Sequence, residues 1–546
     1  MTLFFSFMIS MLITMALIPL LMRSAERLQF VDMPGPRKVH DKKIPRVGGI
    51  AMAVGAVLPI AMWLTPHREV TGFLLGLGVI VVFGVGDDRF NLDYRIKFLG
   101  QIAAVLAVML YGGVFIQQVP LLSQGGPMPF YLSFSVTFLF LLGITNAINL
   151  SDGLDGLAGG MTLLSVGAMA FLGYITGNIV VVLIAVAMIG SILGFLRFNT
   201  HPAQIFMGDG GSQFLGYSAG VLSILLTQHG EHRLSPALPL LLLGLPIVDT
   251  AMVMWQRLRA GRSPFLADKN HIHHKLLAIG FSHREAVLLI YITQAALVII
   301  AYLMRGQSDG ALLAVFAGLA VTLFSLFHWA SARGVSLSEW RPPGGRYTRL
   351  RDYVRRMREE GYPLRMACAL AAAVTGGYLL AGVLTAGDVT GDIGALAMAV
   401  FFLMAVQSVR RGGRTVSWTD QLGLYVLATL SIFLGETASH VLPLLQPWVN
   451  GLFVLLAMGV VVGFGLSKHK NFTLTTLDFL VIFAAFTIPN LPQVTIGQAG
   501  LGESVAKLII LFYGTELMML NTPGYVLAMR PLVMVLFLVI GIRGWV

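Results

Sequence analysis

The chain contains 546 residues, of which 56% are hydrophobic and only 12% are charged. Soluble domains carry about 25% charged residues and disordered chains are poor in hydrophobic ones, so the composition excludes both classes. Long apolar runs recur at lengths that span a bilayer, which predicts an all-α polytopic membrane protein. The net charge of +11 comes from basic residues clustered between these runs, as in cytoplasmic loops, and predicts no nucleic-acid partner.

The first apolar run covers residues 2–22 and is followed by basic residues, which predicts a transmembrane helix with its N-terminus outside. Ten more spans are predicted before residue 330, so that residues 1–330 form a core of eleven helices. Their approximate bounds are 48–64, 71–86, 97–118, 132–149, 157–176, 179–196, 212–227, 236–255, 286–304 and 310–328.

Counting sides from the basic first loop places five later segments on the cytoplasmic face: 87–96, 150–156, 197–211, 256–285 and 329–365. The last of these contains a polar linker, residues 331–365, with nine arginines between Arg333 and Arg365. Beyond it, residues 366–546 contain six or seven further apolar spans. These are predicted near 366–385, 394–409, 422–438, 449–466, 475–489, 504–520 and 528–542.

The acidic motifs of the core all fall on the side counted as cytoplasmic. They are Gly86-Asp87-Asp88 at the end of the third span, the stretch from Asn146 to Leu157 at the end of the fifth, and the stretch from Asn199 to Ser212. Asp249 and a loop containing Arg257, Arg259, Arg262, His271, His273 and His274 lie on the same side. Ionisable residues at membrane depth are costly, so this convergence indicates a functional site.

The residue types in these motifs suit phosphate chemistry. Several carboxylates without thiolates favour a hard cation such as Mg²⁺, or Mn²⁺, which prefers oxygen ligands. Lys97, the arginines and the histidines supply positive charge for a transferring phosphate. The glycine-rich stretch from Gly208 to Ser212 lets the backbone approach an anion at a helix N-terminus.

The motifs resemble, in order, those of the polyprenyl-phosphate N-acetylhexosamine-1-phosphate transferases of the WecA/TagO type. The matching stretches are Val31 to His40 with Pro45 to Gly49, Gly86-Asp87-Asp88, Asn146 to Leu157, Phe206 to Ser212, and His271 to His274. The resemblance covers about residues 1–330 and implies an eleven-helix fold in the bacterial inner membrane, with a cytoplasmic active site. It also implies Mg²⁺-dependent transfer of a sugar 1-phosphate from a UDP-sugar to undecaprenyl phosphate, with release of UMP, and a homodimer.

By the same resemblance, individual residues take roles. Asp209 is expected to bind the metal, with Asp155 and Asp152 close to it, and Asp87, with Asp88 beside it, to orient or deprotonate the lipid phosphate. Lys97 is expected to contact phosphate. The substrate-binding set is Asn149, Phe206, Arg257, Arg259, Arg262, His271, His273 and His274, with Phe206 stacking on the uracil.

Three questions stay open at the level of sequence. Ile272 interrupts the histidines, which resembles the branch that uses UDP-N-acetylglucosamine, yet other UDP-N-acetylhexosamines fit the same motifs. Two mechanisms are possible. The lipid phosphate attacks the β-phosphorus directly, which we favour, or an aspartate first forms a covalent phosphosugar intermediate. The product is expected to start a lipid-linked cell-envelope glycan such as a lipopolysaccharide O-antigen, without indication of which one.

Two other classes compete with the transferase. A transporter would place ionisable residues near the bilayer midplane in both halves, whereas here the acids gather at cytoplasmic helix ends. An inactive scaffold of glycan assembly is the third candidate. The presence of every motif aspartate argues against it. For residues 366–546 we favour a scaffold or oligomerisation role over a second activity in glycan export or polymerisation.

Overall fold

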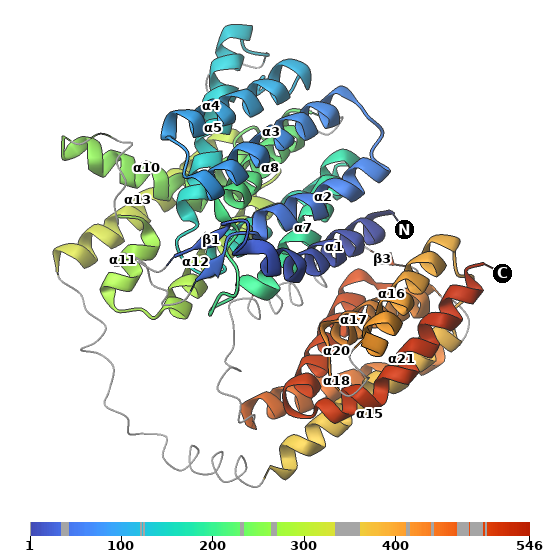
Figure 1. Ribbon diagram of the computed structural model, residues 1–546. Helices are drawn as coiled ribbons and strands as arrows, with labels where there is room; N and C mark the ends of the chain where they lie inside the picture. The colour runs from blue at the N-terminus through green and yellow to red at the C-terminus, as the bar shows by residue number, and fades with distance from the viewer. Residues whose placement is uncertain are drawn as a thin grey trace. The chain divides into compact units, whose positions relative to one another are not determined.

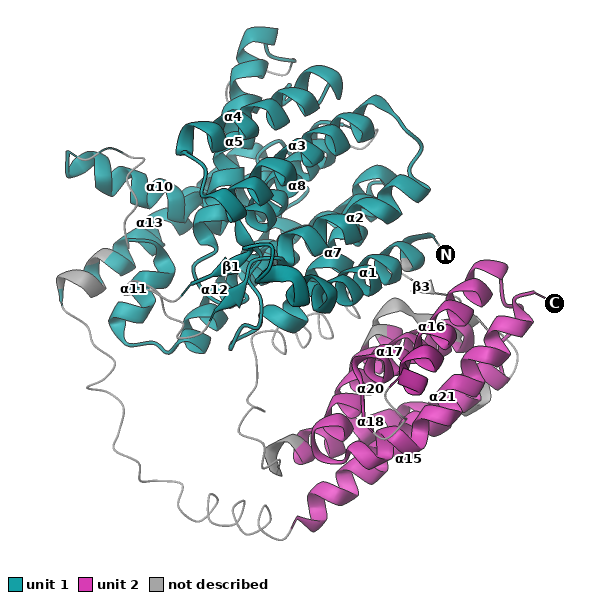
Figure 2. Cartoon of the chain, in the orientation of Figure 1, with its two compact units in different colours: residues 1–341, 475–480 teal, residues 342–474, 481–546 magenta. Residues whose placement is uncertain are grey.

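A computed structural model describes residues 2–33, 43–120, 123, 126–229, 234–261, 263, 270–333, 361–410, 415–437, 442–466, 480, 495–496 and 499–545. Within these residues almost all regular structure is helical (Figure 1). The chain divides into two compact units (Figure 2). Unit 1 contains residues 1–341 with 475–480, and unit 2 contains residues 342–474 with 481–546.

Each of the eleven spans predicted for residues 1–330 corresponds to helix in unit 1. In chain order the helices are α1 (Thr2–Ala25), α2 (Gly48–Trp63), α3 (Arg68–Phe90), α4 (Tyr94–Leu106), continued by the π-helical turn η1 (Ala107–Tyr111), α5 (Phe130–Ser151), α6 (Leu157–Ile175), α7 (Ile179–Asn199), α8 (Gly208–Gln228), α9 (Leu238–Leu242), α10 (Gly244–Arg259), α11 (Ile272–Ile279), α12 (His283–Leu303) and α13 (Asp309–Ala332).

Two features of this series differ from the prediction. The ninth span is divided into α9 and α10 at Leu243. Leu243 has φ −113° and ψ 20°, outside the helical region, and Pro246 has no N–H to donate to the carbonyl of Leu242. The short helix α11 lies in a segment predicted as a loop; Asp249 accepts a hydrogen bond from its first backbone N–H, at Ile272 (2.8 Å).

Helix α8 lies at the centre of unit 1. It packs against α3 and α5, and also contacts α2, α6, α7 and α9. All of its residues from Gly210 to Gln228 are buried, including Gln213 and Gln228. A helix shielded by its neighbours can carry polar side chains that lipid would not tolerate, because the protein supplies their hydrogen-bond partners.

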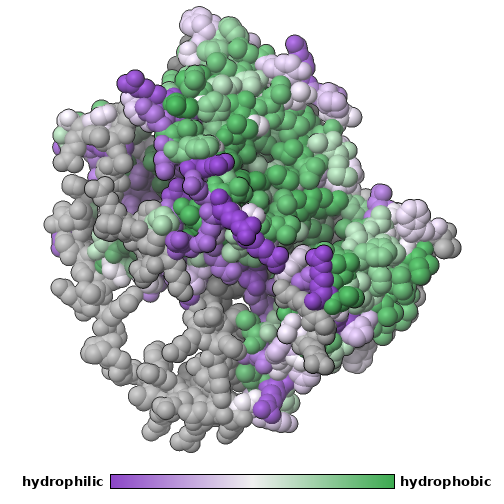
Figure 3. All heavy atoms as spheres, viewed as in Figure 1, coloured by the Kyte–Doolittle hydropathy of each residue, from purple (hydrophilic) through white to green (hydrophobic). Residues whose placement is uncertain are grey.

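Eleven helices among the described residues are long and apolar enough to cross a membrane, eight in unit 1 and three in unit 2. The number equals that of the predicted core spans, but the two sets differ, because α2, α9 and α10 are too short and α8 is too polar. Figure 3 shows a broad hydrophobic surface on unit 1. Leu75, Val82 and Leu110 are among the exposed large hydrophobic side chains of this unit. An apolar surface of this extent is typical of contact with lipid. The chain is an all-α, multi-pass membrane protein.

Unit 2 contains helices at six of its seven predicted spans. They are α15 (Tyr362–Leu384), α16 (Gly391–Arg410), α17 (Trp418–Thr437), α18 (Leu442–Leu466), α20 (Leu501–Asn521) and α21 (Pro523–Arg543). Of the span predicted at 475–489 the structure describes only Leu480, and most of the linker at 331–365 lies outside the described residues. Helix α17 is largely buried and packs against α15, α16, α20 and α21 among the described residues of this unit.

Candidate active site

The centre of the candidate site is a lysine shared by two carboxylates. Helix α3 ends at Asn91, whose left-handed conformation (φ 47°) turns the chain, and Asp93 then caps the start of α4. This turn brings Lys97 back beside Asp87, with 2.5 Å between Lys97 Nζ and Asp87 Oδ2. Lys97 Nζ also donates to Asp209 Oδ2 at 3.2 Å. The prediction that the motifs containing Asp87 and Asp209 meet is therefore realised in the geometry.

Asp88, next in the chain, makes different contacts. Its Oδ1 accepts from the backbone N–H of Asp209 at 2.8 Å, and its Oδ2 accepts from that of Gly210 at 3.1 Å. Gly208 has a φ of 69°, and a Cβ there would overlap the Asp88 carboxylate. Asp88 therefore satisfies the exposed N–H groups at the start of α8, and only glycine fits beside it.

Asp152 and Asn149 complete the oxygen-rich face near Asp209. Asn149 Oδ1 accepts from Ser212 Oγ of α8 at 2.6 Å, which ties the end of α5 to the first turn of α8. Burial, together with the negative charges of Asp209 and other carboxylates nearby, raises the pKa of Asp152 to about 7. Asp152 is thus placed where carboxylates repel one another, as at a cation-binding site.

A small antiparallel hairpin supports this face. Strand β1 (Val31–Asp32) pairs with β2 (Ile44–Pro45), and the backbone of Phe206 bonds to it: Phe206 N donates to Pro45 O at 2.8 Å and Gly48 N donates to Phe206 O at 3.0 Å. Arg46, which follows β2, forms an ion pair with Asp32, and its charge also acts on Asp152. Arg46 lies within the motif from Pro45 to Gly49 but was not predicted as a site residue; its position two residues before Gly48-Gly49 was the available signal.

Asp155 faces a different group of residues from Asp209. Its Oδ2 lies 2.7 Å from His201 Nδ1 and accepts from Ala203 N at 3.1 Å. Burial acts to raise the pKa of Asp155, but the hydrogen bond from His201 and the charge of His283 outweigh it, so the pKa is lowered. No hydrogen bond or ion pair joins Asp155 to Asp209 in the described part of the chain.

Two residues that were not predicted as site residues fix the loop that carries Asp152 and Asp155. Asn199 Oδ1 accepts from Gly156 N at 2.9 Å, while its amide donates to Ile205 O at 2.7 Å. Tyr291 Oη donates to Gly156 O at 2.6 Å. Asn199 and Tyr291 thereby fix both backbone groups of Gly156, whose φ is 79°.

The predicted histidines lie beside the same loop. His271 Nδ1 lies 2.9 Å from Asp249 Oδ2, and Asp249 therefore orients this ring. His273 is buried under Gly153, where an added Cβ would overlap the ring. Burial lowers the pKa of His273 to about 3, so that this imidazole is neutral at physiological pH. The His274 ring lies 4.2 Å from that of His273.

The three predicted arginines are placed unequally. Arg257 is buried, whereas Arg259 is exposed and its guanidinium lies 5.1 Å from the ring centroid of Trp255. Arg262, together with Asp268 and Lys269 of the same loop, lies outside the described residues. The structure therefore does not bring Arg259 to the cluster formed by Asp87, Lys97 and Asp209.

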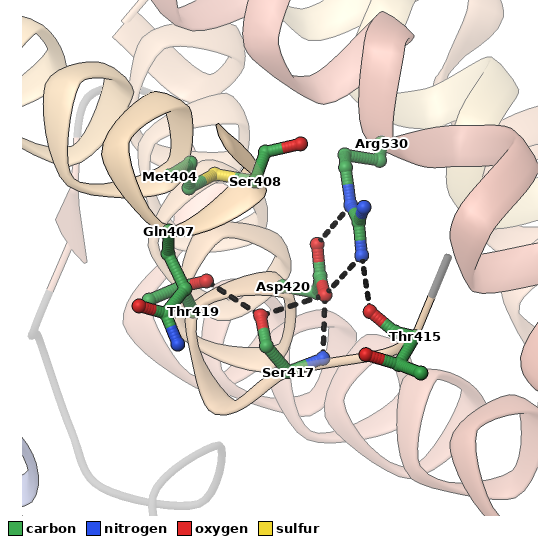
Figure 4. A pocket seen from close by; sticks show the side chains of 8 residues that line it. All are labelled: Met404, Gln407, Ser408, Thr415, Ser417, Thr419, Asp420 and Arg530. Atoms are coloured by element: carbon green, nitrogen blue, oxygen red, sulfur yellow. Dashed lines mark hydrogen bonds and ion pairs between the residues drawn. The ribbon is translucent and has the colours of Figure 1, made fainter. Parts of the chain in front are cut away.

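Unit 2 has one polar cluster that invites comparison (Figure 4). Asp420 lies in the first turn of α17. Arg530 of α21 donates to both of its oxygens, from Nε at 2.6 Å and from Nη2 at 2.8 Å. Ser417 adds bonds to Asp420 Oδ2 from its backbone N (2.7 Å) and its Oγ (2.9 Å). Both oxygens of Asp420 are thus occupied, and the pair ties α17 to α21. Sequence reasoning missed this pair.

Fold and site together define a multi-pass membrane protein with carboxylates and cations gathered at the ends of buried helices. The model of glycosyl transferase family 4 matches residues 70–227, which include Asp87, Lys97, Asp152, Asp155 and Asp209. The chain is 38% identical over 289 residues to a probable undecaprenyl-phosphate N-acetylglucosaminyl 1-phosphate transferase of Bacillus subtilis, an alignment covering 53% of this chain and 80% of that relative.

Two more relatives carry the name undecaprenyl-phosphate alpha-N-acetylglucosaminyl 1-phosphate transferase. The relative from Yersinia pestis is 33% identical over 299 residues, covering 53% of this chain and 80% of the relative. The relative from Escherichia coli K12 is 31% identical over 284 residues, covering 50% and 76%. The chain belongs to glycosyl transferase family 4, and the resemblance noted from its motifs is confirmed.

Proposed function

We propose that the chain transfers N-acetylglucosamine 1-phosphate from UDP-N-acetylglucosamine to undecaprenyl phosphate, releasing UMP and starting a lipid-linked cell-envelope glycan. The observation that carries the proposal is the Lys97 ammonium held between Asp87 and Asp209 at the N-terminus of α8. A cation there suits a diphosphate substrate, whose negative charge it offsets. The names of the relatives supply the sugar and the lipid.

The donor set fits a Mg²⁺ or Mn²⁺ ion. Asp209 is one-third exposed, and Asp152 faces the same carboxylates without a hydrogen-bond partner among the described residues. Hard divalent cations take such oxygen ligands and retain substrate phosphate oxygens as well. Asp209 and Asp152 would hold the ion, which when bound supplies positive charge to the diphosphate.

The reaction we propose is a direct displacement. An oxygen of the lipid phosphate attacks the β-phosphorus of the donor, and the bond from that phosphorus to the oxygen of the leaving UMP breaks. A phosphate is ionised near neutral pH, so it needs no base. Lys97 offsets negative charge on the phosphates. Asp87 Oδ1 accepts a hydrogen bond from Leu92 N (2.8 Å) and its Oδ2 pairs with Lys97, so Asp87 positions that lysine rather than acting as a nucleophile.

The neighbouring loop and helix α11 provide the walls of the donor site. Asp249 holds His271 in one orientation, and the neutral His273 supports the backbone at Gly153. Phe206, with its backbone fixed on β2, remains our candidate for stacking on uracil. The basic loops predict that this site faces the cytoplasm from the bacterial inner membrane.

The experiment is UMP release by the purified full chain, given UDP-N-acetylglucosamine, undecaprenyl phosphate and Mg²⁺. We expect release that requires the lipid, stops with EDTA and is abolished by Asp209→Asn. Release only with another UDP-N-acetylhexosamine would change the sugar but keep the chemistry. Folded protein that releases no UMP with any of these donors would contradict the proposal and favour a transporter or scaffold.

A further inference from the structure

Three amide side chains from different helices meet one helical turn from the candidate active site. They are Gln101 of α4, Asn146 of α5 and Gln213 of α8, and the two glutamines are only 3% and 2% exposed. Asn146 Nδ2 donates to Gln101 Oε1 at 2.8 Å. Gln101 Nε2 donates in turn to Asn146 Oδ1 at 3.2 Å and to Gln213 Oε1 at 3.3 Å. This amide triad therefore joins α4 to both α5 and α8.

The amide triad and the candidate site connect α4 to α8 at two levels. Gln101 follows Lys97 by four positions and Gln213 follows Asp209 by four, so each pair shares one face of its helix. The upper level is the ion pair between Lys97 and Asp209 at 3.2 Å, and the lower level is the bond between Gln101 and Gln213. In the described part of the chain, no other side chain of α4 bonds to α8.

The two levels differ in what a substrate can do to them. Lys97 and Asp209 are each one-third exposed, so a phosphate that binds the ammonium, or a cation that binds the carboxylate, competes with their ion pair. Gln101 and Gln213 are uncharged and buried, so no substrate group reaches them. A hydrogen bond in such surroundings is stronger than one in water. The lower level therefore persists when the upper one opens.

We propose that Gln101, Asn146 and Gln213 are positioning residues, which hold α4 in place while Lys97 leaves Asp209 for the phosphate of the substrate. The other side of α4 packs closely against α3 through small residues and rings, which fix no direction by themselves, whereas polar side chains between membrane helices do. Without the amide triad, α4 can shift on α3 and carry Lys97 with it. The expected effect on turnover rests on the proposed transfer reaction, but the hold on Lys97 does not.

The first test is UMP release by the full chain carrying Gln101→Met, which keeps the length of the side chain and removes its hydrogen bonds. We expect turnover per folded molecule to fall about tenfold, since a displacement of about 1 Å at a site can cost about a hundredfold. Gln213→Met removes only the bond between α4 and α8 and should show a smaller loss; it carries the same comparisons if Gln101→Met does not fold. Gln228→Met is the matched control, because this buried amide bonds to the backbone at Gln117 and Gln118, at the other end of α8, and its loss should leave turnover unchanged.

A double variant shows whether the amide triad acts through Lys97. Lys97→Met combined with Gln101→Met should turn over as slowly as Lys97→Met alone, because no ammonium is left to position. If Gln101→Met lowers turnover by the same factor with and without Lys97, the triad acts elsewhere and the proposal is overturned. Unchanged turnover in the single variant Gln101→Met would overturn it as well.

A last measurement does not need the reaction. Limited acetylation of the purified full chain by acetic anhydride, followed by mass spectrometry, reports how firmly Lys97 is held, with the exposed Lys43 as internal reference. We expect Lys97 to be acetylated several-fold faster in Gln101→Met and at the unsubstituted rate in Gln228→Met. An unchanged rate in Gln101→Met would overturn the positioning role. Faster acetylation in a chain that releases no UMP would contradict the proposed function alone.

Discussion

Helices α8 and α17 are both buried in their units, but the aspartate in the first turn of each differs in exposure and in its partners. Each helix is buried among its neighbours and has an aspartate in its first turn that meets a basic residue from another helix. Asp420 is 4% exposed and both of its oxygens bond to Arg530. Asp209 is 33% exposed and shares Lys97 with Asp87.

The comparison shows how a structural charge pair differs from a site. A buried pair in which every polar atom is satisfied holds helices together and offers nothing to a ligand. A single ammonium shared between two carboxylates, next to the start of a helix, leaves charge and space for substrate. The first arrangement predicts effects on stability when it is altered, and the second predicts effects on turnover.

The largest effect we expect is on the stability of unit 2. Arg530→Met removes one partner of the buried pair and leaves the Asp420 carboxylate unpaired, at a cost of about 3–5 kcal/mol. The melting temperature should fall, while UMP release per folded molecule stays unchanged. The double variant Asp420→Leu with Arg530→Met should recover most of the loss. An unchanged melting temperature in the single variant would show that the pair does not stabilise the unit.

The next effect concerns turnover rather than stability. Lys97→Met removes the cation between Asp87 and Asp209, and the turnover number should fall about 10²–10³-fold, as when one charge-stabilising donor is lost from an active site. Arg95→Met, which removes an exposed cation two residues earlier on α4, is the matched control and should retain activity. Equal activity of the two variants in steady-state UMP release would remove Lys97 from the mechanism.

A smaller effect is expected from pH. With the pKa of Asp152 raised to about 7, the fraction of its carboxylate form falls about tenfold between pH 8 and pH 6. Because a cation binds the carboxylate and not the neutral acid, Mn²⁺ affinity should rise with pH across this range. Electron paramagnetic resonance of free Mn²⁺ measures it. Asp152→Asn should bind more weakly and without this dependence; a pH-independent affinity in the unsubstituted chain would exclude Asp152 as a ligand.

The smallest effect is expected at the start of α8. Asp88→Asn keeps one acceptor but loses the negative charge that faces two backbone N–H groups, and should cost about 1 kcal/mol of stability. Thermal melting of the variant measures this loss. A drop as large as that of Arg530→Met would mean that Asp88 does more than cap the helix.

The helices could be predicted because each apolar run is bounded by polar residues, and the same count placed the acidic motifs on one face. That count brought Asp87 and Asp209 together although 122 residues separate them. It did not show the break between α9 and α10 at Leu243, because a proline alone does not mark a break: α2 continues through Pro59. Nor could it show that α8 is shielded from lipid, because that follows from packing.

Within the site, side-chain direction was the part that sequence could not supply. Asp87 and Asp88 are adjacent, yet one faces Lys97 and the other faces the backbone of α8. Asp152 and Asp155 are three residues apart, yet only Asp155 reaches His201. Arg257 is buried and Arg259 exposed for the same reason: successive residues leave a helix in different directions. The contacts of Asn199 and Tyr291 with Gly156 depend on packing, although Asn199 stands at the start of a predicted motif.

The most direct test compares the two aspartates in one assay. Lipid-dependent UMP release is measured for the full chain, for Asp209→Asn, and for the double variant Asp420→Leu with Arg530→Met, each normalised to folded protein. We predict that Asp209→Asn abolishes release and that the double variant retains it. Retained release in Asp209→Asn, or loss confined to the double variant, would contradict the assignment of the transfer site to α8.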